Sequence, residues 1–320
     1  RKYGSRIRVG VESGRALAIN SGRRNEPEPL FIGDAANIAA KLADGDEEGV
    51  ALGSRARLAL MHDQAVHLSD TGLLMDEASH ILRGASSRIG PEVVQKAFGE
   101  FRVAELADAA RPAGFAFFRH RLPLQTIDFG ELSPHRSARQ EMVSIFADLS
   151  GFTAYVHQGM VSGRIEQVVS NLHVLRGEMA AVLRDFGGRK IRFIGDCIQG
   201  VLAEGQQSQT DVMLTIRKAV EVAGALRSSF ELAQTLLPGI GDLGLKIGVE
   251  WGTTPITRLG IRGDRSVRCA SSKAVTVSER VQRQCGSNQT ALGASALAKA
   301  PATIRSAFGH TGCLSGLDFP

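Results

Sequence analysis

The chain has 320 residues, of which 43% are hydrophobic, 5% aromatic and 22% charged, and its formal net charge is +5. This composition predicts a globular protein of two domains or one large one. It excludes a membrane-spanning protein, because no apolar stretch approaches the roughly 18 residues needed to cross a bilayer. The small charge excess and the scarce aromatic residues argue against nucleic acid as the natural partner.

The N-terminus and the cysteines indicate a cytoplasmic protein. The first residues, RKYGSR, lead straight into an alternating apolar run, without an initiator Met or the apolar region of a secretory signal. The four cysteines are scattered without a C-x-x-C pair, which argues against a disulfide framework and a zinc knuckle. We therefore expect buried reduced thiols and an N-terminus that is the start of a fragment.

Two sequence patterns near the N-terminus recur later in the chain. Residues 7–14, IRVGVESG, alternate like a strand and resemble residues 245–252, LKIGVEWG. Residues 33–41, GDAANIAAK, predict a loop and a helix, and they match residues 263–273, GDRSVRCASSK. Self-similarity of this kind predicts two tandem copies of one fold.

Only the second copy has a front half. Residues 142–147 form a β-rich run, residues 165–183 have helical apolar spacing, and residues 190–194 alternate like a strand. We therefore expect residues 140–320 to form a complete domain with a C-terminal tail, and residues 1–60 to be the back half of a first domain.

The segment between the copies, residues 61–139, is expected to be a linker with its own helices. Helical patches lie around residues 92–98 and 100–110. Residues that punctuate secondary structure are spread along it: Gly84, Pro91, Pro112, Gly114, Pro123 and Pro134.

Two motifs of the second copy point to metal and nucleotide chemistry. The sequence SIFADLSGFT at 144–153 is an apolar strand that ends in Asp148 and is followed by a turn and a helix, whose N–H groups at Gly151, Phe152 and Thr153 suit triphosphate oxygens. The sequence FGGRKIRFIGD at 186–196 presents a second strand whose hairpin turn ends in Asp196. Two carboxylates on adjacent strands predict a site for two cations.

These motifs resemble those of the class III nucleotidyl cyclases, whose catalytic domains carry F-x-D-x-x-G-F-T and G-G-x-x-x-K/E-x-I-G-D. The resemblance covers about residues 144–292 as a complete domain and about residues 6–58 as the back half of another. It implies an α+β fold in which each domain has a ferredoxin-like βαββαβ core with an antiparallel sheet, the first domain being incomplete. It also implies that two cores pair head to tail, with active sites at their interface.

The same resemblance implies a set of roles for residues around the carboxylates. Asp148 and Asp196, with the backbone carbonyl of Leu149, would bind two Mg²⁺ or Mn²⁺ ions, and attack of the ribose 3′-oxygen on the α-phosphorus would release pyrophosphate. Lys246, and Arg8 in the first copy, stand where the family places an arginine that neutralises the triphosphate. A lysine that reaches solvent is the alternative for Lys246.

The family's transition-state asparagine and arginine come from the partner domain. The first copy has Asn37 and, in place of the arginine, Lys41. In the second copy Arg268 falls near the asparagine position, and Ser272 or Lys273 near the arginine position. A helix-capping or turn role is the alternative for Asn37.

Base selection in the family uses a lysine for adenine or a glutamate for guanine, and this chain has Arg192 there. A guanidinium only donates hydrogen bonds, so it favours the acceptor-rich edges of uracil, guanine or cytosine over adenine. The family's second base reader, an aspartate or cysteine, falls on Leu30 and Gly260, so neither purine code is present. A strand residue that reaches solvent is the alternative for Arg192.

The chain resembles the pyrimidine nucleotide cyclases of bacterial anti-phage systems in three features: neither purine-selecting residue is present, the two copies are in tandem, and residues 144–153 read SIFADLSGFT. The resemblance implies cyclic UMP or cyclic CMP made as an infection signal for a companion effector, with UTP the favoured substrate. The alternatives are a cyclase of ATP or GTP, and a degenerate cyclase-like module that binds nucleotide or dimerises.

Two dimer arrangements remain open at this point. The two copies of one chain can pair, which sets Asp148 and Asp196 against Asn37 and Lys41. Alternatively, the second copies of two separate chains can pair, which sets Arg192 and Arg268 against the partner's aspartates.

Overall fold

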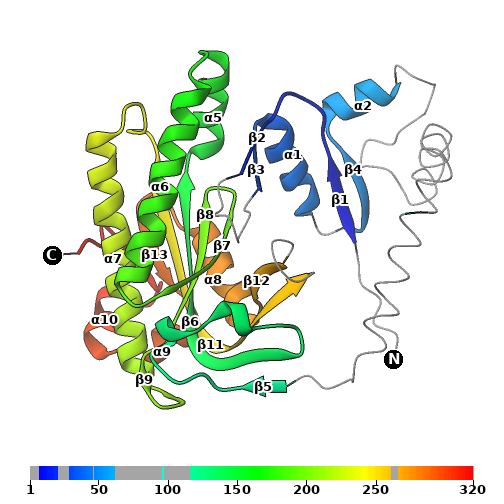
Figure 1. Cartoon of the computed structure of the whole chain (residues 1–320). Coiled ribbons are helices and arrows are strands. Elements are labelled where there is room, and N and C mark those ends of the chain that lie inside the picture. Colours follow the sequence, from blue (N-terminus) through cyan, green and yellow to red (C-terminus); the bar gives the residue numbers. More distant parts are fainter. Residues whose placement is uncertain are drawn as a thin grey trace. The chain divides into compact units, whose positions relative to one another are not determined.

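The computed structural model describes residues 7–20, 29–45, 47–61, 96, 116–260 and 266–319, and it divides the chain into two compact units (Figure 1). Unit 1 comprises Arg1–Ile19 and Phe31–Gly114, and unit 2 comprises Asn20–Leu30 and Phe115–Pro320. The helices expected at 92–98 and 100–110 lie outside the described residues, apart from Lys96, which is helical. Within the described part of the chain, no helix is both long enough and apolar enough to cross a bilayer.

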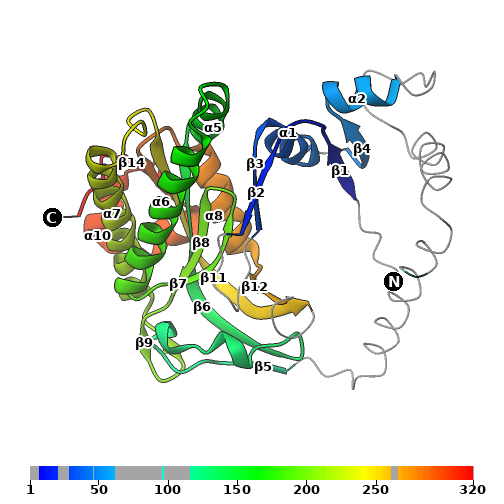
Figure 2. The ribbon, with the colours of Figure 1, turned by 45° about the horizontal axis from the view of Figure 1, so that its top comes forward.

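Unit 2 contains the expected βαββαβ core. Its elements are β6 (Arg136–Ser150), α6 (Ile165–Asp185), β7 (Arg189–Ile194), β8 (Cys197–Leu202), α7 (Val212–Leu236) and β11 (Gly244–Gly260). The four strands lie in the order β11-β6-β8-β7, and all three neighbouring pairs are antiparallel. This is the ferredoxin-like arrangement predicted from the sequence, and Figure 2 shows it with the top of the Figure 1 view brought forward.

Shorter elements extend this core. The sheet gains β5 (Ala116–Phe118), β12 (Ser266–Ala270), β13 (Gln289–Leu292) and β14 (Cys313–Ser315). The remaining helices are α5 (Phe152–Val161), α8 (Lys273–Gln284), α9 (Ala294–Lys299) and α10 (Ala302–Phe308), with 3₁₀ turns at Leu124–Thr126 and Phe129–Glu131. A small hairpin pairs β9 (Gly205–Gln206) with β10 (Gln209–Thr210).

Helices cover both faces of the sheet. Successive strand residues point to opposite faces. Gly200, opposite Ile145, leaves room for the side chain of Leu183 on α6, whereas the neighbouring Ser144 receives a 2.9 Å hydrogen bond from Ser278 on α8. Helix α6 therefore packs on one face and α8 on the other.

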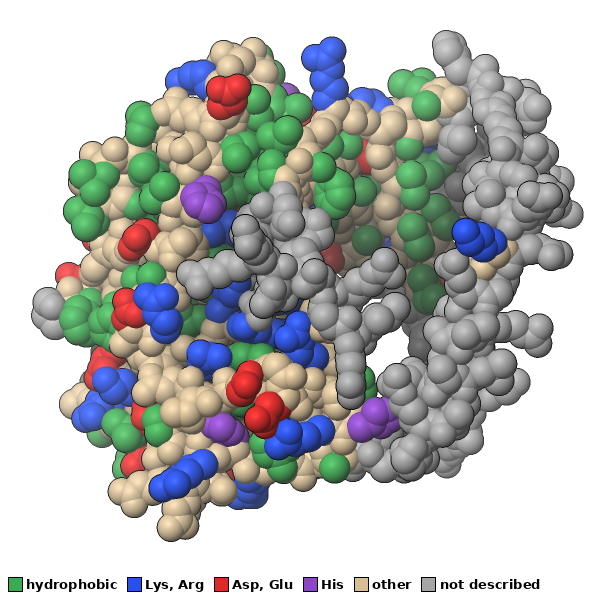
Figure 3. Space-filling view, viewed as in Figure 1, with side chains coloured by type: hydrophobic (Ala, Val, Ile, Leu, Met, Phe, Trp, Pro, Cys, Tyr) green, Lys and Arg blue, Asp and Glu red, His purple; other side chains and the backbone are tan. Residues whose placement is uncertain are grey.

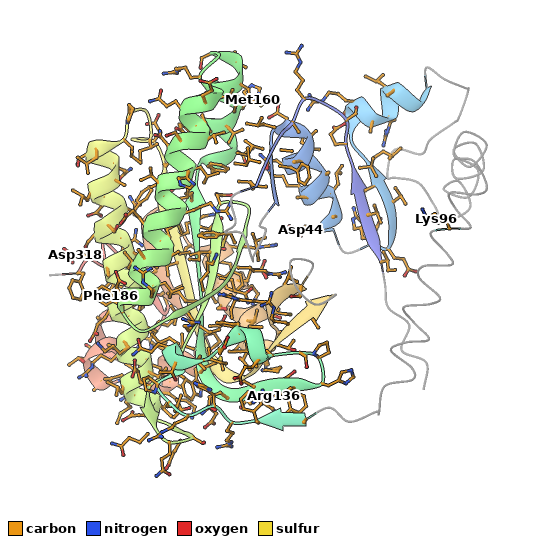
Figure 4. The ribbon with its side chains drawn as sticks, in the orientation of Figure 1. Asp44, Lys96, Arg136, Met160, Phe186 and Asp318 are labelled. Atoms are coloured by element: carbon orange, nitrogen blue, oxygen red, sulfur yellow. The ribbon has the colours of Figure 1, made fainter. Side chains whose placement is uncertain are left out.

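The C-terminal end of the chain packs beside α6. Phe186, labelled in Figure 4, follows the last residue of α6, and its ring meets the ring of Phe319 edge-on with centroids 4.9 Å apart. This contact fixes the final residues against unit 2.

Residues 116–139 belong to unit 2 and not to the linker in which they were expected. Leu124, Ile127 and Phe129 are buried in one hydrophobic cluster with Met142 and Val201 of the sheet. Pro123 and Pro134 lie in a bend and a turn beside these apolar side chains, whereas Pro91 and Pro112 lie outside the described residues.

Unit 1 repeats the second half of unit 2. Its elements are β1 (Arg8–Val11), α1 (Asp34–Ala43), β4 (Gly49–Leu52) and α2 (Ser54–Met61). The boundary between the units falls within the paired strands β2 (Leu17–Asn20) and β3 (Pro29–Ile32), because Asn20–Leu30 are grouped with unit 2. Strand β1 runs parallel to β4, with Gly10 opposite Ala51, just as β11 runs parallel to β13, with Gly248 opposite Ala291.

Side-chain contacts extend this match. Glu12 accepts a hydrogen bond from the N–H of Ala56 at the start of α2, and Glu250 accepts one from the N–H of Ala296 at the start of α9. Each carboxylate therefore holds the N-terminus of a helix. Gly10 and Gly248, each two residues before one of these glutamates, allow a helix to pack closely on the strand. A Cβ at Gly10 would collide with the backbone of α1, and a Cβ at Gly248 with that of α8. The two repeats therefore share one local design.

Candidate active site

The two predicted carboxylates meet at one end of the unit 2 sheet. Asp148 lies near the end of β6, and Asp196 lies in the turn between β7 and β8, the latter being the neighbour of β6. Burial and then the nearby charge of Asp148 raise the pKa of Asp196 to about 8, while a backbone hydrogen bond from Leu149 acts in the opposite direction. The two side chains therefore interact directly through their charges.

Asp148 is held by two side chains from other elements. Lys246 lies directly opposite it on β11, with Nζ 3.8 Å from Asp148 Oδ2. The Nε2 of Gln282, on α8, donates a hydrogen bond of 3.2 Å to the same oxygen. Burial raises the pKa of Asp148, and Lys246, Gln282 and Arg283 oppose this shift. Lys246 is therefore engaged in the site and does not simply reach solvent.

The residues at this end of the sheet fit divalent cations. In the ranges that the structure describes, no cluster of three or more His, Cys, Asp or Glu side chains is present, so protein ligands would be few. Burial raises the pKa of both carboxyl groups, and the charge of Asp148 raises that of Asp196 further, so two ionised carboxylates here are unfavourable without additional positive charge. Oxygen ligands of this kind, completed by backbone carbonyl, water and phosphate oxygens, are the set that Mg²⁺ and Mn²⁺ prefer.

Helix α5 begins immediately after β6. Its N-cap residue, Gly151, has φ of 85°, in the left-handed region that glycine adopts without strain. Phe152 is buried and anchors the helix, and Thr153 is exposed. The first N–H groups of a helix have no partner within it, so this N-terminus suits an anion beside Asp148.

Arg192 lies on β7, and Arg268 lies on β12, a strand that contacts β7. Arg192 is exposed and stands directly opposite the buried Gln199 of β8. Arg268 donates a hydrogen bond of 3.0 Å to the carbonyl oxygen of Lys190, and its guanidinium lies 4.2 Å from the ring centroid of Phe129. Figure 3 shows Lys and Arg side chains gathered on this face of unit 2. The position of Arg268 is therefore fixed against β7.

The two repeats place Thr276, and not Arg268, at the position of Asn37. Helix α1 follows Gly33, and the N–H of Asn37 donates to the Gly33 carbonyl oxygen at 3.2 Å. Helix α8 follows Ser272, and the N–H of Thr276 donates to the Ser272 carbonyl oxygen at 3.1 Å. Asn37 is thus inside its helix and does not cap it.

The same register places Arg280 at the position of Lys41, and both side chains are exposed. The expected match of residues 263–273 to residues 33–41 differs from this because β12 occupies residues 266–270 and α8 begins only after Ser272. Ser272 is the N-cap of α8 and accepts a hydrogen bond from the N–H of Val275, so Ser272 and Lys273 start the helix and do not take the arginine position.

The same register changes which residue of unit 2 occupies the family's second base-reading position. Leu30 lies three residues before Gly33, and Cys269 lies three residues before Ser272. Cys269 is half-buried and pairs with Thr257 of β11. The position therefore carries a thiol in unit 2, where the sequence comparison had placed Gly260.

Arg8 has a structural role in unit 1. Its Nε donates to the carbonyl oxygen of Leu42 at 2.6 Å, and its Nη1 donates to that of Glu47 at 2.8 Å. These bonds satisfy backbone carbonyls at the C-terminal end of α1. Arg8 is therefore occupied, in contrast to its equivalent Lys246, which faces a carboxylate.

Comparison with known proteins identifies the family. Residues 136–300 match the family described as the adenylate and guanylate cyclase catalytic domain. A protein named uridylate cyclase from a Rhizobium species is 47% identical over 99% of this chain and 62% of its own length. A second protein of that name, from Pseudomonas aeruginosa, is 38% identical over 98% of this chain and 61% of its own length.

A solved structure supports the same assignment. The crystal structure of a class III adenylyl cyclase-like ATP-binding protein from Pseudomonas aeruginosa superposes with a TM-score of 0.84 at 38% identity, covering 98% of this chain and 66% of that one. This chain thus spans a little under two thirds of each of these relatives. Its fold, its paired carboxylates and the match over residues 136–300 agree, and the chain belongs to the adenylate and guanylate cyclase catalytic domain family.

Proposed function

We propose that the chain is the catalytic part of a nucleotidyl cyclase that converts a nucleoside triphosphate, UTP before others, into its 3′,5′-cyclic monophosphate and pyrophosphate. The observation that carries this proposal is the pair formed by Asp148 and Asp196 within a domain of the cyclase family. The two relatives named uridylate cyclase support UTP as the substrate.

Asp148, Asp196 and the backbone carbonyl of Leu149 would hold two divalent cations, Mn²⁺ or Mg²⁺. When bound, such cations supply positive charge to the triphosphate and make the ribose 3′-hydroxyl more acidic. The N-terminus of α5, at Gly151, Phe152 and Thr153, would orient the phosphates through its backbone N–H groups. The 3′-oxygen then attacks the α-phosphorus, the bond to the bridging oxygen breaks, and pyrophosphate leaves.

Lys246 contributes positive charge to the same place. Its ammonium nitrogen is 3.8 Å from Asp148 Oδ2, and its side chain is 21% exposed. From this position it limits the repulsion between the two carboxylates, and it lies within reach of a phosphate that occupies the site.

The cation that acts on the α-phosphate comes from a second cyclase domain. Lys41, with Asn37, would supply it if the two units of one chain pair, and Arg280, with Thr276, would supply it if the second units of two chains pair. We assign the role to Arg280 and not to Arg268, because Arg280 shares the helical position of Lys41. The guanidinium of Arg268 instead donates a hydrogen bond to the carbonyl oxygen of Lys190.

Base selection would depend on Arg192 and Cys269. The Arg192 guanidinium donates to carbonyl groups, which uracil presents at O4 and O2, and a thiol is only a weak donor and acceptor. Adenine presents a donor amine and fits such a pocket worst. The relative whose title describes ATP binding makes ATP the substrate that most needs to be tested against UTP.

A role in anti-phage signalling rests on the resemblance to bacterial pyrimidine nucleotide cyclases. In this proposal the enzyme is cytoplasmic, makes its cyclic nucleotide after infection, and acts through a separate effector. The alternative is a catalytically degenerate module that binds nucleotide or dimerises.

Incubation with Mn²⁺ and each nucleoside triphosphate separates these functions. Cyclic UMP and pyrophosphate in equal amounts support the proposal. Nucleotide binding without turnover supports the degenerate module.

A further inference from the structure

Gln282 is a buried polar residue at the centre of the site. Its side chain is 3% exposed and lies in the last turn of α8. Helix α8 rests so closely on β11 that a Cβ at Gly248 would collide with the carbonyl oxygen of Ser278 and with the backbone nitrogen and Cβ of Gln282. The close approach leaves little freedom for the amide of Gln282.

The amide reaches one particular oxygen of the carboxylate. The Nε2 of Gln282 donates to Asp148 Oδ2 at 3.2 Å, and Lys246 Nζ lies 3.8 Å from the same oxygen. A carboxylate rotates about its Cβ–Cγ bond, and a hydrogen bond and an ion pair on the same oxygen restrict that rotation. Oδ1 is then the oxygen that remains for a cation.

Unit 1 supplies an internal comparison. The position equivalent to Gln282 is Ala43, since the backbone nitrogen of Ala43 stands beside Gly10 as that of Gln282 stands beside Gly248. The same close packing of helix on strand is therefore satisfied by alanine in unit 1, so the packing itself does not require the amide of Gln282.

We propose that Gln282 is a positioning residue, whose amide fixes the Asp148 carboxylate so that Oδ1 faces the divalent cation. Partners that orient a metal ligand in this way commonly contribute roughly 10- to 100-fold to metal affinity. The inference rests on the cation site of the proposed function. Gln282 itself touches neither cation nor nucleotide.

The test measures binding of Mn²⁺ alone, without nucleotide, by electron paramagnetic resonance of the free ion. Gln282→Met removes the hydrogen bond and keeps the length of the side chain, and we expect it to weaken Mn²⁺ binding roughly 10- to 100-fold. Gln282→Ala, the residue that unit 1 carries, is a second variant with the same expectation. Gln140→Met is the matched control, because Gln140 is also a buried glutamine but bonds to Thr210.

Comparison with Asp148→Ala separates the two proposals. Loss of Mn²⁺ binding in Asp148→Ala, with weakened binding in both Gln282 variants and normal binding in Gln140→Met, is the expected result. Normal binding in a folded Gln282 variant, while Asp148→Ala has lost it, overturns the positioning role and leaves the cation site in place. Normal binding in Asp148→Ala itself overturns the cation site and the inference with it.

Discussion

Lys41 and Arg280 occupy the same position in two copies of one helix, each eight residues after the N-cap residue, Gly33 in α1 and Ser272 in α8. Gly10 of β1 and Gly248 of β11 allow the two helices to pack closely on these strands at equivalent helix positions. Unit 2 therefore has, besides its paired carboxylates, an exposed arginine at the position of Lys41, and we propose that this arginine serves the site of a partner domain.

Arg280→Ala should lower kcat roughly 100-fold or more and change KM much less, because a charge that acts in the transition state is lost. Steady-state kinetics with UTP measures this. Arg305→Ala is the control, since Arg305 is an exposed arginine on α10. If Arg280→Ala is fully active and Lys41→Ala is inactive, Lys41 and not Arg280 acts on the α-phosphate. That result would favour pairing of the two units within one chain.

Asp196→Asn should abolish turnover and at the same time raise the melting temperature of the cation-free protein. The substitution removes a cation ligand, and it also removes the charge that Asp148 repels across a partly buried site. Thermal unfolding in chelator, with the activity assay, checks both effects. A variant that loses stability would show that the two carboxylates are not in conflict.

Gly248→Ala should destabilise unit 2 by about 1–3 kcal/mol, because the added methyl group meets the backbone of α8. Gly177→Ala is the matched control. Gly177 is exposed in the middle of α6 with open space around its Cβ position, so alanine there should stabilise by about 0.5–1 kcal/mol. Chemical denaturation of both variants measures the difference, and an unchanged free energy of unfolding in Gly248→Ala would contradict the close helix contact.

Arg192→Glu should weaken discrimination in favour of UTP by about 1–3 kcal/mol, because the donor to the uracil carbonyls becomes an acceptor. The ratio of kcat/KM values for UTP and ATP is the quantity to compare. Arg184→Glu is the control, because it reverses the charge of an exposed arginine on α6. The same ratio in Arg192→Glu as in the parent would mean that Arg192 does not read the base.

The sequence predicted what depends on local pattern. Asp148 lies near the end of β6 and Asp196 in the turn after β7, so a few adjacent residues were enough to predict where both carboxylates lie. The GVE-x-G repeat is equally local, and it correctly indicated two copies of a common fold. The ferredoxin-like order of the strands followed from the family resemblance.

The missed features depend on residues that are distant in sequence or on an exact register. Gln282 is 134 residues from Asp148, and only the packing of α8 on β11 brings them together. The register of α8 was misplaced because β12 separates the second glycine-aspartate pair from the helix, whereas in unit 1 the same pair starts the helix. The boundary at residue 139 was misplaced because prolines mark turns within a domain as readily as linkers.

We propose that this chain makes a cyclic pyrimidine nucleotide at Asp148 and Asp196. The most direct test incubates the protein and its Asp148→Ala variant with Mn²⁺ and UTP, CTP, GTP and ATP in separate reactions, and identifies the products by mass spectrometry. We expect cyclic UMP as the main product, less product from CTP or GTP, least from ATP, and none from the variant. Cyclic AMP as the main product, or equal turnover by Asp148→Ala, would contradict the proposal.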